Sequence, residues 1–418
     1  MAKKSKPLLP ENLSILFITF SRWDQGKRTP TNGSLDPLRD FLVPKIKKLV
    51  IIDQPHPSGE GVMPIIEEYK NHHMNFKSYT SSWWMNLLKP FLSSSHTDPH
   101  KTYIRFKIRD FLSVLDWGVR SKTKYEYCIC LESINTVAAI LLRKMGKVKH
   151  VVYYVSDFSP KRYNNKLFNS LYLALDRFCA INADYIWDVS PAMQKARIEE
   201  AGLNPLKSAK AIHVPNGLYP NQIKASKKTN TNNHDIVYMG ILSVDNGPDV
   251  AIKALQIVKK AIPDARLHII GGTEMDYIWL SKITKKLKLE KSVIRHGFIK
   301  SGAEMSAIIR SCSIGLAPYR AIPGSIRYYA DAGKIRAYCA SGLPVVSSQV
   351  PPLGQFIATQ GAAIIAHDDP VSFAKAIIDL LHDKKKYSNL RKNAIIFGQH
   401  NTWNNTFTSA FKAMNGNK

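Results

Sequence analysis

The sequence lacks any apolar run of about 18 residues, the length that a helix needs to cross a bilayer. The most apolar stretch, residues 167–187, is interrupted by Asp176, Arg177 and Asp184. We therefore expect no membrane-spanning helix. The first residues, MAKKSKPLLPENLS, also lack the apolar core of a secretion signal, which favours a cytoplasmic protein.

Cysteine is scarce, with 5 residues in a chain of 418, which excludes a disulfide framework. Cys128 and Cys130 share one face of an apolar, strand-like run and have no partners at metal-ligand spacing, so we interpret them as buried thiols. His367, Asp368 and Asp369 precede Val371 in a pattern typical of a helix N-cap. We expect no metal and no cofactor, and a reducing compartment.

Acidic residues are also few. The chain has 32 Asp and Glu against 59 Lys and Arg, a formal charge of +27, while 44% hydrophobic residues exclude a disordered or fibrous protein. This excess attracts nucleic acid, anionic membrane or phosphorylated small molecules. No helix-turn-helix, zinc spacing or RNP-like strand is present, so we expect no nucleic-acid partner.

Short apolar runs alternate with helical patterns along the chain, which predicts βαβ units with parallel sheets. Strands are expected at residues 14–20, 49–53, 127–131, 150–155, 183–189, 236–239, 266–270, 293–296, 314–317 and 343–347. A stretch rich in Lys, Asn, Ser and Thr at residues 206–233 indicates a linker. The fold class is therefore α/β, in two halves of similar size.

The most informative segment is GSIRYYADAGKIRAYCASGLPVVSS at residues 324–348. A glycine-rich loop leads into a helix with Lys334 on its first turn, which ends before Gly342, and an apolar strand follows. Free N–H groups at a helix N-terminus attract anions. By pattern alone, this is either a phosphate site or an ordinary loop–helix–strand unit.

Residues 334–346 resemble the donor-binding segment of the GT-B glycosyltransferases, family 4 in particular, where a helix leads into A-x-G-x-P-V-V. Other segments resemble the same family in the same order: VPNG at 214–217, the strand and loop at 237–247, LHIIGG at 267–272, HGF at 296–298 and GLAPY at 315–319. The likeness covers roughly residues 180–400, whereas residues 1–180 match only in the order of strands and helices.

The resemblance implies two Rossmann-like domains that face each other across a cleft. Residues 1–205 would bind the acceptor and residues 234–399 the nucleotide-sugar donor, joined by a linker at 206–233. A C-terminal helix at about 400–418 would return to the first domain.

The sequence departs from the family at its usual phosphate-binding and acidic positions. Ile241 and Asn246 stand where the family has Arg and Lys in the first donor loop, and its Glu-x7-Glu pair falls at Tyr329 and Ala337. We expect Arg327 and Lys334 to supply the missing cations from an open cleft, and Asp331 to act as the missing catalytic acid. The expected donor-binding residues are Asn216, Gly217, Gly240, Gly272, Gly297, Phe298, Ile299, Arg327 and Lys334, with Gly297, Phe298 and Ile299 beside the base.

Candidate acceptor residues follow the N-terminal strands. Gly33 and Ser34 belong to a polar, glycine-containing stretch that is either a mobile acceptor loop or an ordinary surface loop. Asp157 follows a predicted strand, where an inverting enzyme needs a general base; capping of a turn is the alternative. Glu132 is placed similarly, after the strand YCICL.

Trp83, Trp84 and Leu87 recur at helical spacing within SSWWMNLLKPFLSSS and are followed by several basic residues. Aromatic residues beside cations are typical of a membrane interface, although a helix packed into the core has the same pattern. With the positive charge, we expect peripheral association with the inner, anionic face of the membrane.

The leading hypothesis is a hexosyltransferase that moves a sugar from a nucleotide-sugar to a lipid-linked or polysaccharide acceptor in cell-surface glycan synthesis. A catalytically degenerate GT-B protein that binds a sugar or nucleotide is the main alternative. An epimerase or phosphorylase on the same architecture, and a nucleic-acid-binding protein, are weaker ones.

Overall fold

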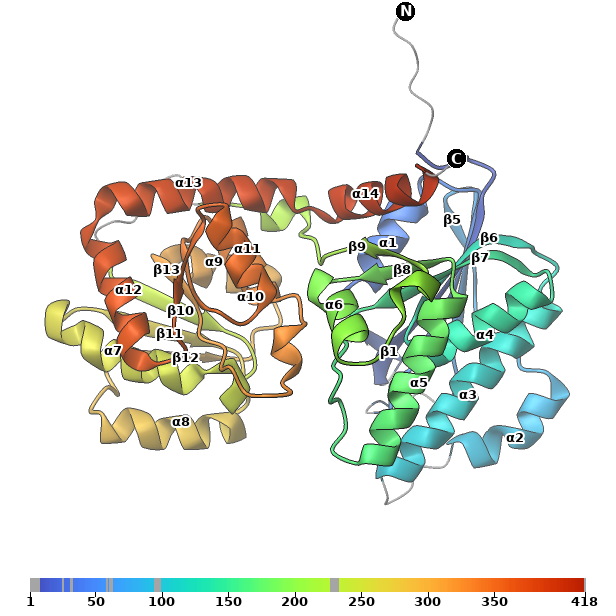
Figure 1. The fold of residues 1–418 in the computed structure, drawn as a ribbon, viewed down its shortest axis with the longest axis horizontal. Helices are drawn as coiled ribbons and strands as arrows, with labels where there is room; N and C mark the ends of the chain where they lie inside the picture. The colour runs from blue at the N-terminus through green and yellow to red at the C-terminus, as the bar shows by residue number, and fades with distance from the viewer. Residues whose placement is uncertain are drawn as a thin grey trace, which may run out of the picture. The chain divides into compact units, whose positions relative to one another are not determined.

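The computed structural model describes residues 8–24, 26–30, 33–57, 59, 63–93, 99–225 and 233–416. It divides into two compact units. Unit 1 comprises Met1–Pro215 and Thr406–Lys418, and unit 2 comprises Asn216–Asn405. Each unit is an α/β structure built around its own sheet (Figure 1), which confirms the expected fold class.

The sheet of unit 1 has nine strands in the order β5-β4-β3-β1-β6-β7-β8-β9, with β2 paired to β1. The parallel strands are β1 (Ser14–Asp24), β3 (Lys48–Pro55), β6 (Tyr125–Leu131), β7 (Val148–Val155), β8 (Tyr185–Asp188) and β9 (Lys210–His213). The antiparallel strands are β2 (Lys27–Pro30), β4 (Ile65–Lys70) and β5 (His73–Lys77). The chain adds strands first on one side of β1 and then on the other, so the strand order reverses between β1 and β6.

Strand β9 lies inside the segment 206–233 that was expected as a linker, and it extends the sheet of unit 1. The sequence of β9, KAIH, has a single buried residue, Ile212, so it does not stand out from the Lys, Asn, Ser and Thr residues around it. The boundary between the two units falls later in the same segment, after Pro215.

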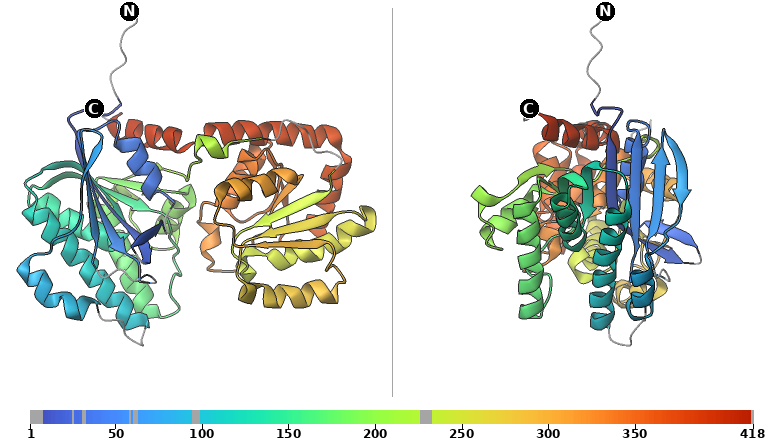
Figure 2. Two further views of the ribbon diagram at one scale, coloured as in Figure 1. Left: turned by 180° about the vertical axis from the view of Figure 1, so that it is seen from behind. Right: turned by 90° about the vertical axis from the view of Figure 1, so that its right-hand side faces the viewer.

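Helices cover both faces of this sheet: α1 (Leu35–Leu42), α2 (Trp83–Ser93), α3 (Pro99–Arg120), α4 (Ser133–Lys144), α5 (Lys166–Asn182), α6 (Pro191–Glu199) and the greater part of α14 (Trp403–Asn415). Helices α2 to α5 form a row in which each contacts the next (Figure 2). The C-terminal helix α14 belongs to unit 1 because Phe411 packs on Phe41 of α1, Tyr127 of β6 and Trp187 of β8.

The sheet of unit 2 has six parallel strands in the order β12-β11-β10-β13-β14-β15. They are β10 (Asp235–Met239), β11 (Arg266–Ile270), β12 (Val293–Gly297), β13 (Ile314–Ala317), β14 (Val345–Ser348) and β15 (Ala363–Ala366). Side chains alternate between the faces: Ile236 and Tyr238 belong to one core cluster and Val237 to the other. The strand order reverses between β10 and β13.

Seven α-helices accompany the described part of this sheet: α7 (Pro248–Ala261), α8 (Glu274–Lys286), α9 (Gly302–Ser311), α10 (Gly333–Ala340), α11 (Pro352–Thr359), α12 (Pro370–His382) and α13 (Lys384–His400). The carboxylate of Asp369 accepts hydrogen bonds from the N–H groups of Val371 and Ser372, each at 2.9 Å, at the start of α12. This confirms the predicted N-cap.

All five cysteines are buried free thiols, which confirms the prediction made for Cys128 and Cys130. The sulfur atoms of Cys128 and Cys130 lie 3.4 Å apart on one face of β6. None of the helices in the described ranges is long and apolar enough to span a bilayer.

Candidate functional site

Gly240 directly follows β10, at the point where the strand order of unit 2 reverses. Ligands of parallel α/β sheets bind outside the carboxyl ends of the strands at such a reversal. Its φ of 134° lies in the region that favours glycine. A Cβ at this position would lie 3.2 Å from Cε and 3.3 Å from Nζ of Lys334, so the absence of a side chain lets the ammonium approach the backbone.

Lys334 lies on the first turn of α10 and is only 6% exposed, which corrects the expectation of an open-cleft lysine. Its Nζ lies 4.1 Å from the ring centre of Tyr238 and 4.4 Å from that of Tyr319. It has no hydrogen-bond partner among the residues that the structure describes. Burial, with the nearby charge of Arg327, holds the pKa of Lys334 well below its usual range. Such a buried cation is favourable only when an anion or a set of acceptors meets it.

Arg327 lies in the loop before α10, and its Nε donates to Asp245 in the first loop of unit 2 at 3.0 Å. Asn246, at the position of the family's lysine, is buried and donates from Nδ2 to Ser243 at 2.6 Å. The structure therefore brings Gly240, Arg327 and Lys334 together. Arg327 is ion-paired, whereas the ammonium of Lys334 donates no hydrogen bond within the described chain.

Asp331 is almost fully buried and forms an ion pair with Arg336 at 2.8 Å. Its other oxygen accepts a hydrogen bond at 2.7 Å from the backbone N–H of Asn216. Beside it, a Cβ on Gly217 would lie 2.4 Å from the backbone nitrogen of Trp403, so only glycine fits at this crossing. The carboxylate of Asp331 thus links Arg336 to the backbone of Asn216, beside Gly217, and we call this contact the clip. Both carboxylate oxygens of Asp331 already have partners in it.

The remaining expected donor residues follow β11 and β12. Gly272 has φ 77°, and a Cβ there would lie 2.4 Å from a methyl group of Leu242. Gly297, with φ 65°, ends β12, and Phe298 after it is 72% exposed. Ile299 packs against the core. An exposed aromatic ring at the carboxyl end of a strand can stack on a nucleotide base.

In unit 1, Asp157 follows β7, and its carboxylate accepts a hydrogen bond from Arg162 at 2.9 Å. Ser34 is buried at the start of α1, while Gly33 before it is exposed. The expected acceptor residues therefore lie at different points of unit 1, Asp157 as one member of an ion pair and Ser34 as part of the core.

Helix α2 presents four apolar side chains to solvent: Trp83 is 76% exposed, Leu87 72%, Phe91 52% and Leu88 39%. Trp84 is half-buried, and Met85 and Leu92 anchor the helix in the core. The guanidinium of Arg105 on α3 lies 4.4 Å from the ring centre of Phe91. The helix therefore has one core-packed face and one exposed face.

Sequence reasoning missed the aromatic rings of Tyr238 and Tyr319, which hold the ammonium of Lys334. The two residues are far apart in the chain and meet only because β10 and β13 are neighbours in the sheet. Tyr319 could have been proposed from the sequence, because it is the last residue of GLAPY and lies just beyond the carboxyl end of β13.

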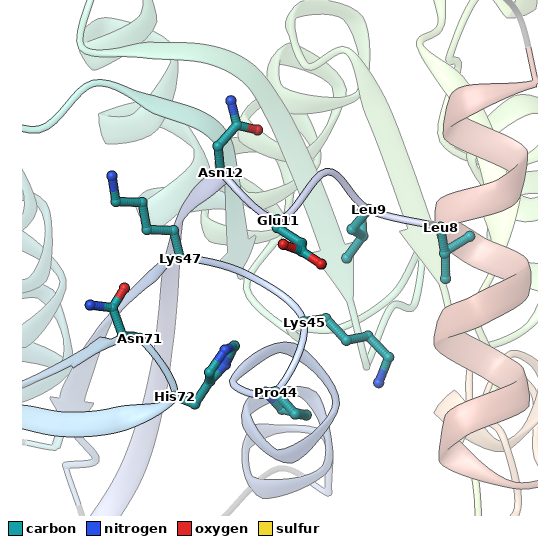
Figure 3. Close-up of a pocket in the computed structure, with 9 residues that line it drawn as sticks. All are labelled: Leu8, Leu9, Glu11, Asn12, Pro44, Lys45, Lys47, Asn71 and His72. Carbon is teal, nitrogen blue, oxygen red and sulfur yellow. The ribbon is translucent and has the colours of Figure 1, made fainter. Parts of the chain in front are cut away.

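Tyr319 also lines a cavity of about 270 Å³ in unit 2, with Tyr328, Gln349, Gln355, His367 and Asp368 among its other walls. A larger cavity of about 650 Å³ lies in unit 1 (Figure 3), lined by Leu8, Leu9, Glu11, Asn12, Pro44, Lys45, Lys47, Asn71 and His72. Lys47 immediately precedes β3, and Asn12 lies two residues before β1. The larger cavity therefore lies at the amino end of the sheet, opposite to the edge where such folds bind ligands.

Within the described part of the chain, no group of three His, Cys, Asp or Glu side chains is placed to hold a metal ion. Beside Gly240, the ammonium of Lys334 is a cation without a hydrogen-bond partner among the described residues.

Residues 233–383 match the family model described as "Glycosyl transferases group 1". No curated protein matches the chain. Among solved structures, HepE of Anabaena in complex with UDP is similar at 16% identity, covering 97% of this chain and 100% of that one, with a TM-score of 0.65. Sucrose-phosphate synthase of Thermosynechococcus elongatus is 13% identical over 97% and 100%, with a TM-score of 0.70. The α,α-trehalose 6-phosphate synthase of Burkholderia multivorans is 12% identical over 97% and 98%, with a TM-score of 0.63.

The family match covers nearly all of the sheet of unit 2 and includes Gly240, Arg327 and Lys334. The structural neighbours extend over both units and share their fold. Residues 233–383 of unit 2 are therefore similar to the group 1 glycosyltransferases, and the whole chain has the GT-B fold.

Proposed function

We propose that the chain transfers a hexose from a nucleotide-sugar to a lipid-linked or polysaccharide acceptor, and that Lys334 contacts the donor diphosphate. The observation that carries this proposal is the buried ammonium of Lys334 beside Gly240, without a hydrogen-bond partner in the described residues. Its place outside β10, where the strand order reverses, is where such sheets bind ligands.

The chemistry of transfer explains why a cation is needed there. Negative charge develops on the diphosphate as the glycosyl bond breaks, and a positioned ammonium stabilises it most strongly where water is excluded. Arg327 adds a second positive charge close to Lys334. The exposed ring of Phe298 is positioned to stack on the base. Two solved structures of HepE hold UDP with glucose or UDP-glucose, which supports a uridine nucleotide as the first donor to test.

The acceptor would bind to unit 1, where Asp157 is our candidate for a general base. Its ion pair with Arg162 holds the carboxylate in position. Gly33 remains a candidate for the loop that approaches the acceptor, because it is exposed.

We further propose that α2 places the enzyme on the inner face of the membrane, where a lipid-linked acceptor in cell-surface glycan synthesis would be available. Trp83, Leu87 and Phe91 form an exposed apolar stripe, and the cationic side chain of Arg105 adjoins it. This combination suits the interface of an anionic bilayer, and the net charge of +27 adds long-range attraction.

One observation favours a second function, donor binding without transfer. Tyr329 and Ala337 stand at the positions of the family's glutamates, and both oxygens of Asp331, the expected replacement, are bonded to Arg336 and Asn216. A protein of this kind would bind a nucleotide-sugar but would release no free nucleotide in the presence of any acceptor.

A thermal-shift panel of UDP-, GDP-, ADP- and dTDP-sugars tests donor binding. A cognate nucleotide at 100 times its dissociation constant is expected to stabilise the fold by about 2.7 kcal/mol. Release of the nucleoside diphosphate in the presence of membrane lipids then separates transfer from binding alone. If none of the four donors raised the melting temperature, the proposal would be wrong.

A further inference from the structure

Glu132 is one of three described non-glycine residues of unit 1 with a positive φ. It directly follows β6 and precedes α4, with φ 68° and ψ 156°. This region of backbone space is essentially restricted to glycine. A strained residue in a place where glycine would fit without strain points to a use for its side chain.

The surrounding structure imposes this conformation. The side chain of Asn135 donates from Nδ2 to the carbonyl of Leu131 at 2.9 Å, and the hydroxyl of Thr136 donates to the carbonyl of Glu132 itself at 2.9 Å. Asn135 and Thr136 are both fully buried. These hydrogen bonds fix the backbone of the turn, so the side chain of Glu132 starts from a fixed position at the carboxyl edge of the sheet.

That position is the point where the strand order of unit 1 reverses, between β1 and β6, and where folds of this type bind ligands. Titratable groups from three further parts of unit 1 interact electrostatically with Glu132 there. Lys107 of α3 forms an ion pair with its carboxylate, and the charge of Glu132 also acts on His56 after β3 and on Arg162 after β7.

The charges of this group are balanced. Lys107 and Arg162 offset Glu132 and Asp157, and burial lowers the pKa of His56, so that its ring is neutral at pH 7. These side chains are nevertheless partly open to solvent, with 34% of the Glu132 side chain exposed and 18% of Lys107.

Two other charges act on His56, and each of them has an opposite partner. Arg22 pairs with Asp24 at 2.5 Å, and Asp110 pairs with Arg109 at 2.7 Å. Each of the named positive charges therefore has an acidic partner, an arrangement that suits the hydroxyl groups of an uncharged sugar better than a phosphate.

We propose that Glu132 and Lys107 bind the hydroxyl groups of a neutral sugar, the end of the acceptor that receives the transferred residue. This inference rests on the proposed transferase function, and it assigns the acceptor class and two acceptor-binding residues.

The test uses UDP-saturated full-length protein and two probes, octyl glucoside as a neutral sugar and glucose 6-phosphate as an anionic one. Binding of each is measured by NMR titration to the parent protein and to Glu132→Gln and Glu132→Gly. The first variant removes the charge and keeps the strain, whereas the second removes both. Lys288→Gly is the matched control, because Lys288 also has a positive φ, 55°, and lies on the exposed surface of unit 2.

We expect the parent to bind octyl glucoside and both Glu132 variants to bind it at least tenfold more weakly, while Lys288→Gly binds it like the parent. Glu132→Gly should melt no lower than the parent, since the strain is relieved. Binding of UDP should be unchanged in all variants, so a parent that fails to bind UDP overturns the proposed function instead. Preference of the parent for glucose 6-phosphate, absence of octyl glucoside binding, or parent-like binding by the Glu132 variants would overturn the inference.

Discussion

Replacing Lys334 by methionine removes the ammonium and keeps most of the side-chain volume between the rings of Tyr238 and Tyr319. Without ligand, we expect the variant to be at least as stable as the parent, because a buried charge without a partner is often replaced by an apolar side chain at no cost. The pKa of Lys334 is lowered by burial, so the unfolded chain binds more protons between that pKa and the usual one. The parent therefore loses stability as the pH falls through this interval, and the variant does not.

When a nucleotide is bound, we expect the parent to be more stable than the variant. A charge-assisted hydrogen bond to phosphate contributes about 1.5–3 kcal/mol, which corresponds to a roughly 10- to 150-fold loss of affinity in the variant. At a nucleotide concentration that stabilises the parent by about 2.7 kcal/mol, a tenfold loss leaves about 1.4 kcal/mol and a hundredfold loss about 0.4 kcal/mol.

Differential scanning fluorimetry with and without UDP measures both effects, and isothermal titration calorimetry gives the dissociation constants. Lys260→Met, on the exposed surface of α7, serves as the control and should behave like the parent in both assays. If Lys334→Met binds UDP as tightly as the parent, Lys334 does not contact the diphosphate, and the assignment of the site must be abandoned.

Three further predictions concern other parts of the chain. Trp83→Ser combined with Leu87→Ser should release the protein from anionic vesicles in a flotation assay and keep a cooperative melt, since both side chains are exposed; loss of the melt would show that they are part of the core. Asp331→Asn should lower the free energy of unfolding in urea by about 3–5 kcal/mol, because it leaves the buried Arg336 without its ion pair; a loss below about 1 kcal/mol would contradict the clip. Burial raises the pKa of Asp53 to about 7, so its contribution to stability falls as the pH rises from about 4 to 7. Asp53→Asn should therefore gain stability over the parent at pH 8 and not at pH 4 in thermal scans, and an equal difference at both pH values would refute this.

The central strands of both sheets could be predicted because they are buried on both faces and read as continuous apolar runs, as in Ile15–Ile18, which are fully buried. The edge strand β5 could not be predicted. Every residue of β5 is exposed, including Met74 and Phe76, so no buried apolar run marks this strand. Here the backbone pairing with neighbouring strands, and not side-chain burial, defines the structure.

Within the site, the resemblance to the GT-B family brought Gly240, Arg327 and Lys334 into one prediction, and the structure places them together. The resemblance did not predict the burial of Lys334, which depends on the ring of Tyr238 in β10 and the ring of Tyr319 just after β13. The ion pair of Asp331 with Arg336, which joins the residue two positions before α10 to the helix itself, was not foreseen either. Contacts such as those of Lys334 depend on tertiary packing and leave no period or motif in the sequence.

The most direct test of the central claim follows a radiolabelled sugar from its nucleotide to an acceptor. Purified protein is incubated with labelled UDP-sugars and extracted membrane lipids, and the label in lipid or glycan is measured together with the UDP released. We predict equal amounts of labelled product and UDP with at least one donor, reduced at least tenfold in Lys334→Met. If the parent binds UDP but transfers no label and releases no UDP with any nucleotide-sugar, the chain is a binding protein on the GT-B fold and not a transferase.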